Sequence, residues 1–410
     1  MSNRPEHVVV VGAGLGGVRT IEQLRATGYE GRITLIGAEP HPPYDRPPLS
    51  KQILSGAWDP ERVVLRDKPA LDELGVAYRL GAAAVALHGT SVDLDDGTSV
   101  AGDAVVLATG VVPRKLAGQP DGVWTLRTLD DAVALRDALE NSQSLLVLGA
   151  GFIGAEVAHA ARTRGLDVTV LEALPVPCER ALGPEVGVLA GRLFTEAGVD
   201  LRCGTRISRF VDAHTVALPD DTTLSADVVL VGVGAAPELT WLDNAGFETT
   251  AGLACDATGR VRTEAGEWAA GIWALGDIAA WWDEPRGRRH RAEHWTSTVD
   301  QAAVVARDIL GAEQPAAAVP YVWSDQFDLK IQLVGRPDLA DEILPLHGAG
   351  LDGGPVRGTV VGYLAADRLV AVAGFGAARY LPRYRAMVAA GAHRGSALSL
   401  AQELAGGVVR

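Results

Sequence analysis

The 410-residue sequence has only three cysteines, Cys178, Cys203 and Cys255, and they lie far apart. Neither a C-x-x-C nor a C-x-x-x-x-C pattern occurs. This lack removes the simplest sequence evidence for a redox-active disulfide, and also for a metal site of zinc or an iron–sulfur cluster. Because free cysteine is usually buried, we expect three reduced and mostly buried thiols.

Long hydrophobic runs and an excess of basic residues are also missing. No apolar run approaches the ~20 residues that a membrane helix needs. The N-terminus reads MSNRPEH and continues at once into VVVVGAG, which predicts a strand and a turn in place of a signal peptide. The formal net charge of −14 argues against general binding to nucleic acids or anionic membranes. We therefore expect a soluble, cytoplasmic protein.

The chain is too long for one ordinary core, because a domain usually takes ~100–200 residues. Two or three domains are expected. A hydrophobic content of 48% with 48 Gly and 22 Pro is typical of an α/β protein with many tight turns.

One sequence unit occurs twice. Residues 8–17 read VVVVGAGLGG and residues 145–154 read LLVLGAGFIG. Each is an apolar strand that runs into G-x-G-x-x-G, followed by a helical pattern, a second strand and an acid, Glu39 or Glu172. The six glycines are Gly12, Gly14, Gly17, Gly149, Gly151 and Gly154.

The repeated context indicates two dinucleotide sites, whereas a lone G-x-G-x-x-G would be weak evidence. The first glycine permits the tight turn, the second lets a pyrophosphate approach the backbone, and the third lets the helix pack on the strand. The amides at the helix N-terminus then face the phosphates, and the acid accepts hydrogen bonds from a ribose. Two such sites suggest FAD together with a nicotinamide cofactor.

The second acid favours NADH over NADPH. A carboxylate at Glu172 suits the 2′-hydroxyl of NAD and repels the 2′-phosphate of NADP. Ala173 follows it, so no arginine stands directly beside it. Arg180, eight residues further on, leaves NADPH open.

Three more buried strands fit two dinucleotide sites. Residues 103–110, 226–234 and 271–277 read DAVVLATG, ADVVLVGVG and GIWALGD. Their ends should bring backbone to the carboxyl edge of a parallel sheet, where ligands of such sheets bind. Asp277 is a candidate cofactor ligand, a helix N-cap, or both. The other candidate dinucleotide contacts are Ala108, Thr109, Gly110, Ile153, Gly232, Val233 and Gly234.

More specific motifs accompany the glycine turns. These are PYDRPPLSK (43–51), TLRTLDDA (125–132), AEHWTSTVDQA (292–302) and VPYVWSDQFDLKIQLVG (319–335). With them, the chain resembles the FAD-dependent, NADH-linked ferredoxin reductases. These serve bacterial cytochrome P450 and ring-hydroxylating dioxygenase systems, and they are similar in fold to glutathione reductase.

The resemblance implies an α/β fold with two Rossmann-like dinucleotide-binding domains, for FAD and NAD, plus a C-terminal α+β interface domain. The FAD domain is expected to hold residues 1–110 and 245–319. The NAD domain is expected at 111–244 and the interface domain at 320–410. In the last, KIQLVG, GTVVGYLA and LVAVAGFG look like strands, YLPRYRAMVAAGA looks helical, and a mostly polar and small-residue tail follows.

The resemblance also implies roles for single residues. Arg46 and Lys51 are expected along the flavin, Arg127 is expected to contact FAD, and Asp277 to hold the ribityl chain. Glu293 and Trp295 are expected near the nicotinamide and the flavin. Trp295 as a plain core residue is the alternative, because most tryptophans are highly buried.

The resemblance also implies that Lys51 pairs with Glu156, and this pairing makes physical sense. Both are ionic groups in otherwise apolar segments, and a buried charge needs a partner. The alternative is that Glu156 is simply a polar residue on a helix face.

The implied reaction is hydride transfer from NADH to FAD and then two single-electron transfers to a [2Fe–2S] ferredoxin that serves a P450 or a dioxygenase. A flavin can couple the two steps because it handles electrons singly or in pairs. Disulfide reductases of this fold carry redox cysteines after the first ribose acid. Here that region (42–56) reads PPYDRPPLSKQILSG and has no cysteine, so electrons are expected to leave directly to a docked protein.

Residues 285–295 read PRGRRHRAEHW, a basic stretch in an acidic chain. We expect a loop between a helix that begins after Asp277 and the EHW motif. Ferredoxins of this kind are usually acidic, so a local basic patch would orient the encounter within the Debye length of ~8–10 Å. The candidate docking residues are Arg286, Arg288, Arg289 and Arg291. The alternative is a solvated loop with no specific role.

The sequence departs from the family pattern at two places. Arg19 stands where small residues are common, and the segment VRTEAGEWAAGIWALGD (261–277) is longer than usual before its last strand. We expect both to lie at loop or helix-surface positions.

Other functions stay open. They are a rubredoxin reductase, a monodehydroascorbate-type radical reductase, and an NADH-sensing flavoprotein like apoptosis-inducing factor. A monomer and a homodimer are both compatible with the sequence.

Overall fold

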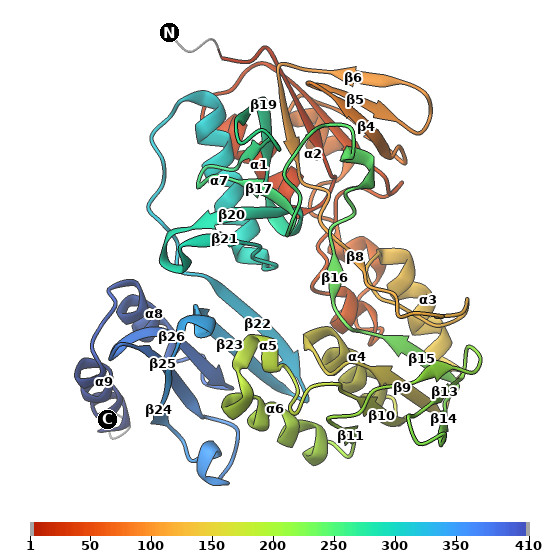
Figure 1. Ribbon diagram of the computed structural model, residues 1–410, viewed down its shortest axis with the longest axis vertical. Coiled ribbons are helices and arrows are strands. Elements are labelled where there is room, and N and C mark those ends of the chain that lie inside the picture. Colours follow the sequence, from red (N-terminus) through yellow and green to blue (C-terminus); the bar gives the residue numbers. More distant parts are fainter. Residues whose placement is uncertain (1–3, 407–410) are drawn as a thin grey trace. The chain divides into compact units, whose positions relative to one another are not determined.

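The computed structural model describes residues 4–406 (Figure 1). The chain divides into two compact units, each assembled from three segments. The first holds the described residues up to Asp45, Glu61–Val112 and Ala235–Ala318. The second holds Arg46–Pro60, Pro113–Gly234 and the described residues from Val319 onward. The three-domain boundaries stay a prediction.

The first unit is built on a nine-stranded sheet with the order β21-β20-β17-β18-β19-β7-β1-β2-β3. Its five consecutive strands from β19 to β3 are parallel. They are β1 (His7–Val11), β2 (Arg32–Gly37), β3 (Val76–Leu80), β7 (Ala104–Leu107) and β19 (Trp268–Ala274). The predicted parallel strands are therefore present, in the order of a doubly wound sheet.

Alternation along β1 sets the two faces of this sheet. Val8 and Val10 pack with helices α1 (Leu15–Ala26) and α7 (Trp295–Leu310). Val9 and Val11 face the other side, where β4 (Ala84–His88), β5 (Ser91–Leu94) and β6 (Ser99–Ala101) form a small antiparallel sheet. Because both faces are covered, β1 is a continuous apolar run.

Two expectations for the segment after β19 are wrong. Asp277 lies inside a 3-10 turn, η4 (Gly276–Ile278), and caps no helix. The chain continues into β20 (Ala279–Asp283), which pairs in parallel with β17 (Leu253–Cys255). The apolar run after Asp277 supplies buried side chains to the sheet, so it forms a strand where a helix was expected.

The basic stretch is also ordered differently from the expected loop. A 3-10 turn, η5 (Glu284–Arg286), leads into β21 (Arg288–His290), which pairs antiparallel with β20. The stretch is therefore a β-hairpin at the sheet edge. The segment 261–277 is likewise mostly strand, because β18 (Arg260–Arg262) pairs antiparallel with β19.

The second unit contains a parallel sheet with the order β11-β10-β9-β15. The strands are β9 (Ser144–Leu148), β10 (Asp167–Leu171), β11 (Asp200–Arg202) and β15 (Val228–Val231). Helices α3 (Leu129–Glu140) and α4 (Phe152–Thr163) pack on one face, with Leu54 from the 46–60 segment in the same core. Strands β12 (Arg209–Phe210), β13 (Thr215–Ala217) and β14 (Thr223–Ser225) form a second small sheet against the other face.

The C-terminal part of this unit is a five-stranded antiparallel sheet with the order β22-β23-β26-β25-β24. The strands are β22 (Tyr321–Gln326), β23 (Leu329–Gly335), β24 (Glu342–His347), β25 (Val360–Ala365) and β26 (Arg368–Phe375). One face packs with helices α5 (Glu179–Leu182) and α6 (Pro184–Glu196). The other packs with helices α8 (Leu381–Ala389) and α9 (Arg394–Gly406).

Most of the polar and small-residue tail, for which the sequence predicted no element, forms helix α9. Ala397, Leu400 and Ala401 are buried. Their i, i+3, i+4 spacing places them on one helix face, but two of the three are alanines, so the apolar stripe is weak in the sequence.

Candidate functional site

The first glycine turn joins β1 to α1 and has no room for side chains at two of its positions. Gly12 has a φ of +116°, and a Cβ there would lie 2.3 Å from the Ala108 carbonyl oxygen. A Cβ on Gly17 would lie 2.1 Å from the Gly12 carbonyl oxygen. A Cβ on Gly14 would meet no atom within 4 Å. The first and third glycines are thus required by the fold, and the second leaves space for a ligand.

Helix α1 begins at this space without a side-chain cap. Gly14 is the N-cap residue, and the first turn contains no acid. The amides at a helix N-terminus attract anions when nothing in the protein satisfies them. The turn therefore fits a pyrophosphate.

The second glycine turn, between β9 and α4, has the same construction. Gly149 has a φ of +108°, and a Cβ added there would lie 2.6 Å from the Gly232 carbonyl oxygen. A Cβ on Gly154 would lie 2.0 Å from the Gly149 carbonyl oxygen, and one on Gly151 would meet nothing within 4 Å. Gly151 caps α4 without a side chain, and the first turn again lacks an acid. The second turn therefore fits a pyrophosphate in the same way as the first.

The two acids that the sequence predicts to contact a ribose follow β2 and β10. Glu39 Oε2 accepts a hydrogen bond of 2.6 Å from the Tyr44 hydroxyl. Glu172 Oε2 accepts one of 2.6 Å from the Ala150 amide, inside the second glycine turn, and Oε1 accepts from Leu174. The Glu172 carboxylate is thereby fixed beside the turn that it would serve. Arg180 lies in the short helix α5.

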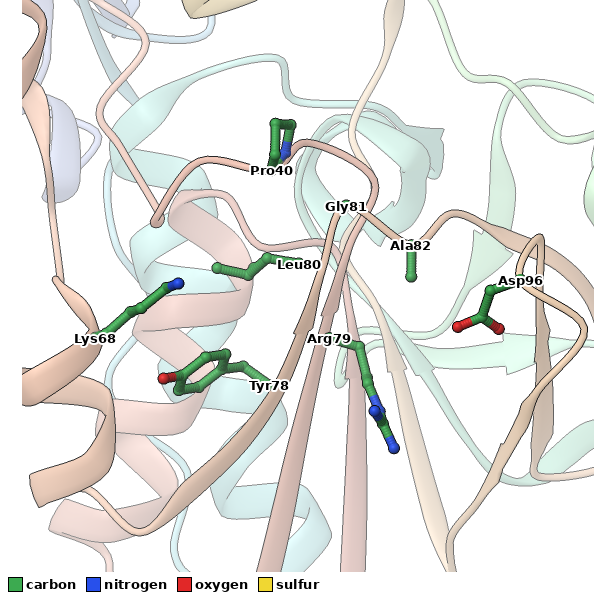
Figure 2. Close-up of a pocket in the computed structure, with 8 residues that line it drawn as sticks. All are labelled: Pro40, Lys68, Tyr78, Arg79, Leu80, Gly81, Ala82 and Asp96. Atoms are coloured by element: carbon green, nitrogen blue, oxygen red, sulfur yellow. The ribbon is translucent and has the colours of Figure 1, made fainter.

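A pocket of about 320 Å³ is lined in part by Pro40, the residue that follows Glu39 in the chain (Figure 2). The loop after β3 forms part of it, and the Gly81 amide donates to the Glu39 carbonyl. The pocket lies at the carboxyl end of the parallel strands, where a dinucleotide held at Gly14 and Glu39 would extend. Its lining residues are Pro40, Lys68, Tyr78, Arg79, Leu80, Gly81, Ala82 and Asp96.

The three other strand ends that were predicted to lie at the carboxyl edge of a parallel sheet do so within their own units. Ala108, Thr109 and Gly110 follow β7, and the Ala108 amide donates to Val11 beside the first turn. Asp277 follows β19, the parallel neighbour of β7. In the second unit, Gly232, Val233 and Gly234 follow β15 beside the second turn. Ile153 lies exposed in the first turn of α4.

The predicted pair between Lys51 and Glu156 is present. Lys51 lies in the π-helical turn η1 (Leu49–Ile53), and its Nζ is 2.7 Å from Glu156 Oε2. Glu156 is 2% exposed, so it is not a surface residue of α4. Ser50 donates to the same carboxylate oxygen over 2.5 Å, and Ser324 donates to the other over 2.5 Å.

The two serines were not predicted to contact Glu156. Ser50 stands in PPLSK and Ser324 in WSDQ, so both motifs were visible in the sequence. Nothing in the sequence links residues 50, 156 and 324, because only the tertiary fold brings them together.

Trp295 is the first residue of α7, and Glu293 lies just before this helix. Trp295 Nε1 donates to Asp45 Oδ1 over 2.8 Å, and the Arg19 guanidinium lies 6.0 Å from the indole ring. Trp295 is half-buried, so it is not a plain core residue. Glu293 is exposed and pairs with Arg291 over 2.5 Å. Burial lowers the pKa of His294 between them, so this imidazole is neutral at pH 7.

Arg46 and Arg127 also lie together, in the second unit. Arg46 Nη1 donates to the Arg127 carbonyl oxygen over 2.7 Å. The Arg127 amide donates to Asp131 at the start of α3. Two segments 81 residues apart in sequence are therefore connected, and the contacts of both arginines with FAD stay a prediction.

The four arginines of the basic hairpin differ in exposure. Arg286 pairs with Asp283 over 2.6 Å and its side chain is only 7% exposed. Arg289 reaches Glu248 at 3.5 Å, and Arg291 pairs with Glu293. Arg288 is exposed on β21. Three of the four arginines thus lie beside acids, and Glu248 is shared between Arg289 and Arg262.

The cysteines are as expected. Cys178 and Cys255 are buried, Cys203 is half-buried, and all three are free thiols. Burial raises the pKa of Cys178 to about 12, and it also raises the pKa of Cys203 and Cys255. Within residues 4–406 no group of three His, Cys, Asp or Glu side chains could hold a metal. No helix in this described part is long and apolar enough to cross a membrane.

Two uncapped helix N-termini, each reached through a G-x-G-x-x-G turn and each followed by a ribose acid, define a class of protein. It is the class of α/β oxidoreductases that bind two dinucleotides. The fold class predicted from the sequence is confirmed.

The chain belongs to the pyridine nucleotide-disulphide oxidoreductase family, which matches residues 6–302. A second family, described as reductase C-terminal, matches residues 321–403. The chain is 37% identical over 398 residues to the anthranilate 1,2-dioxygenase system ferredoxin–NAD(+) reductase component of Burkholderia cepacia, with 94% of each chain covered. It is 32% identical over 390 residues to putidaredoxin reductase of Pseudomonas putida, with 90% of this chain and 88% of that protein covered.

A solved structure extends this similarity to three dimensions. The covalent putidaredoxin reductase–putidaredoxin complex contains a chain with a TM-score of 0.87 and 30% identity. The match covers 94% of this chain and 93% of that chain. The resemblance inferred from the sequence motifs is confirmed by these similarities.

Proposed function

We propose that this chain is an FAD-dependent NADH:ferredoxin reductase. It takes reducing equivalents from NADH and passes single electrons to a [2Fe–2S] ferredoxin that serves a P450 or a dioxygenase. The observation that carries the proposal is the presence of two complete dinucleotide turns in a chain whose cysteines are separate, free thiols. Reduction of a disulfide beside the flavin would need a cysteine pair.

The residues present fit both cofactors. The α1 N-terminus and Gly14 would hold the FAD pyrophosphate, and Glu39 would accept hydrogen bonds from its ribose. The N-terminus of α4 and Gly151 would hold the pyrophosphate of NADH. When bound, the flavin supplies the conversion of a two-electron donor into a one-electron donor.

Glu172 makes NADH the proposed donor. Its carboxylate is fixed by the Ala150 and Leu174 amides, so it cannot swing away from a ribose bound at the second turn. A 2′-phosphate there would meet a fixed negative charge. Arg180 would have to approach the phosphate to offset that repulsion.

Lys51 and Glu156 are proposed to position the reactants and to set the charge near the flavin. Hydride transfer itself needs no general acid. The pair instead provides a fixed ammonium whose geometry depends on a buried carboxylate. Arg46, Arg127, Asp277, Glu293 and Trp295 keep their proposed roles near FAD and the nicotinamide.

The proposed partner is an acidic ferredoxin. With a net charge of −14 the reductase would repel such a partner at long range. On the basic hairpin, Arg288 is the main proposed contact for this partner, because the other three arginines are paired with acids. These are Arg286, Arg289 and Arg291. Monomer and homodimer are both compatible with this role, and the cytoplasm is the proposed location.

The test is NADH-driven cytochrome c reduction with and without a small [2Fe–2S] ferredoxin, at low and high ionic strength. Strong stimulation by ferredoxin is expected, and salt should reduce it if charge orients the encounter. Flavin reduction by NADH without stimulation by ferredoxin would contradict the proposed partner. It would then favour a rubredoxin, a small-molecule acceptor or an NADH-sensing role.

A further inference from the structure

Two polar side chains of β22 are completely buried. Ser324 and Gln326 are each 0% exposed. They are two residues apart, so they point to the same face of the strand. Asp325 between them points to the other face, is partly exposed, and reaches Lys330 at 3.4 Å. Buried polar groups are normally retained only where they are hydrogen-bonded, and here their bonds lead to Glu156.

The donors around Glu156 come from two different parts of the second unit. Oε2 accepts from the Ser50 hydroxyl and the Lys51 ammonium, both in η1. Oε1 accepts from the Ser324 hydroxyl of β22 over 2.5 Å. A carboxylate that is 2% exposed keeps its charge only if protein donors replace water. Ser324 is the donor to Glu156 that comes from the C-terminal module, meaning the five-stranded sheet with its helices α8 and α9.

Gln326 determines where the Ser324 hydroxyl points. Gln326 Nε2 donates to Ser324 Oγ over 3.1 Å. A hydroxyl has one proton to donate. With a donor already directed at its oxygen, the Ser324 proton is turned toward Glu156.

The same amide also reaches the second glycine turn. Gln326 Nε2 lies 3.8 Å from Cys178 Sγ, and Cys178 Sγ donates to the Ala150 carbonyl over 3.5 Å. The raised pKa of Cys178 keeps this thiol protonated and therefore able to donate. Within the second unit, a chain of hydrogen bonds thus runs from the turn to Glu156.

We propose that Ser324 and Gln326 are positioning residues that orient the Glu156 carboxylate and, through it, the Lys51 ammonium. Two of the three ammonium protons are directed to Glu156 and to the Pro47 carbonyl. The direction of the third is fixed as long as Glu156 is fixed. The inference rests on the proposed function, because it assigns the C-terminal module a part in the reaction of NADH.

The test compares Ser324→Ala with the control Asp325→Asn, which changes the opposite face of the same strand. The limiting rate of flavin reduction by NADH, measured in single turnovers, should fall about tenfold in Ser324→Ala. The pH profile of this rate should also differ from that of the wild type, because the carboxylate has lost a donor. Calorimetric affinity for NAD⁺ should stay the same, and Asp325→Asn should match the wild type throughout.

Thermal unfolding of the holoenzyme gives a second readout that does not depend on turnover. The lost bond stabilises the charged form of Glu156. The difference in Tm between wild type and Ser324→Ala should therefore be largest near neutral pH and shrink on acidification. Lys51 and the Cys178 thiol are the titratable groups that face Glu156. Burial raises the pKa of Cys178, so this thiol stays neutral over this range.

Two further variants separate orientation from packing. Gln326→Met keeps the volume but removes the donor to Ser324, so it should slow flavin reduction about threefold in the same direction. Ser324→Thr keeps the hydroxyl and should restore the wild-type pH profile. A pH-independent Tm difference together with an unchanged limiting rate and pH profile would overturn the inference, because the residues would then only fill space.

This outcome is distinct from failure of the proposed function. A wild-type enzyme whose flavin is reduced by NADH but which ferredoxin does not stimulate would contradict the proposed partner alone. Equal rates and equal pH profiles for Ser324→Ala and wild type would contradict the positioning role alone.

Discussion

The Glu156 carboxylate is buried in α4 and accepts hydrogen bonds from Lys51, Ser50 and Ser324. The family resemblance predicted the pair with Lys51, and the need of a buried charge for a partner supports it. The full donor shell of Glu156 was not predicted, because the three donors come from segments more than 100 residues from Glu156. The sequence could therefore identify the charges but not their surroundings.

Glu156→Gln should destabilise the protein by about 3 kcal/mol, because it leaves the largely buried Lys51 ammonium without a counter-charge. The double variant Lys51→Met/Glu156→Gln should recover most of that loss, since no charge is then left unpaired. Urea unfolding of the wild type, both single variants and the double variant measures the coupling. Losses that simply add would contradict the pair as a coupled unit.

Cys178 should be unreactive toward thiol reagents in the native protein. With its pKa raised to about 12, about 10⁻⁴ of the thiol is ionised at pH 8, and only the thiolate reacts. Labelling with a chromogenic disulfide should detect slow reaction of the half-buried Cys203 at most, and three thiols in urea. Rapid native labelling of Cys178 would contradict its burial.

The raised pKa of Cys178 also makes the stability of the fold depend on pH. The folded state holds the Cys178 proton more tightly than the unfolded chain, whose thiol titrates near 9.0. Its contribution is therefore complete below pH 9 and is lost as the pH rises toward 12. The unfolding free energy should fall over this alkaline range, and less steeply in Cys178→Ser, whose hydroxyl does not titrate there. Equal slopes would show that other groups, such as Tyr384, dominate.

Each glycine turn lies within one strand–turn–helix element, β1–α1 or β9–α4. Their positions were fully predictable, because each glycine has a separate steric reason that follows from the motif. The β20–β21 hairpin was not predictable. Its basic residues look like a solvated loop in the sequence, and only pairing with β17 and with nearby acids turns it into a sheet edge.

Gly17→Ala and Gly14→Ala should have opposite consequences. A Cβ on Gly17 would lie 2.1 Å from the Gly12 carbonyl, so α1 must move from β1 and the protein should lose stability. A Cβ on Gly14 meets no protein atom within 4 Å, so the fold should survive while FAD affinity falls. Thermal unfolding and flavin content of the purified variants check both statements. Normal flavin content in Gly14→Ala would contradict the proposed pyrophosphate site.

On the basic hairpin, Arg288→Ala should raise the KM for ferredoxin several-fold, because its exposed charge remains available to an acidic partner. Reduction of a small dye by NADH should be unchanged. Arg286→Ala is the matched variant, since its charge is already paired with Asp283. An unchanged KM in Arg288→Ala would remove the hairpin from the docking surface.

At the scale of the whole molecule, the second unit has a hydrophobic core that is shared between the α5–α6 region and the five-stranded sheet. Leu182, Val186 and Leu189 of the α5–α6 region pack with Tyr363 and Phe375 of the five-stranded sheet. Tyr363 also donates its hydroxyl to the Leu182 carbonyl over 2.8 Å. The nucleotide-binding part and the C-terminal sheet should therefore unfold together.

Leu189→Ala should lower the unfolding free energy by about 3 kcal/mol, through the cavity left in this shared core. Its neighbour Val188 is 50% exposed, and Val188→Ala should change the free energy by less than about 0.5 kcal/mol. Urea unfolding should show one transition for the second unit in both variants. Separate transitions for the C-terminal sheet and the nucleotide-binding part would contradict the shared core.

The sequence by itself determined the two dinucleotide turns, the parallel strands behind them and the positions of the acids Glu39 and Glu172. These follow from local sterics and from burial, which can be read along a short stretch of chain, whereas the pairing of Lys51 with Glu156 was implied only by the family resemblance. Only the tertiary structure decided that Asp277 lies in a 3-10 turn followed by a strand, that α9 is a helix, that acids lie beside three hairpin arginines, and that Ser324 meets Glu156. Each of these depends on what lies opposite in space, and residues far apart in sequence supply it.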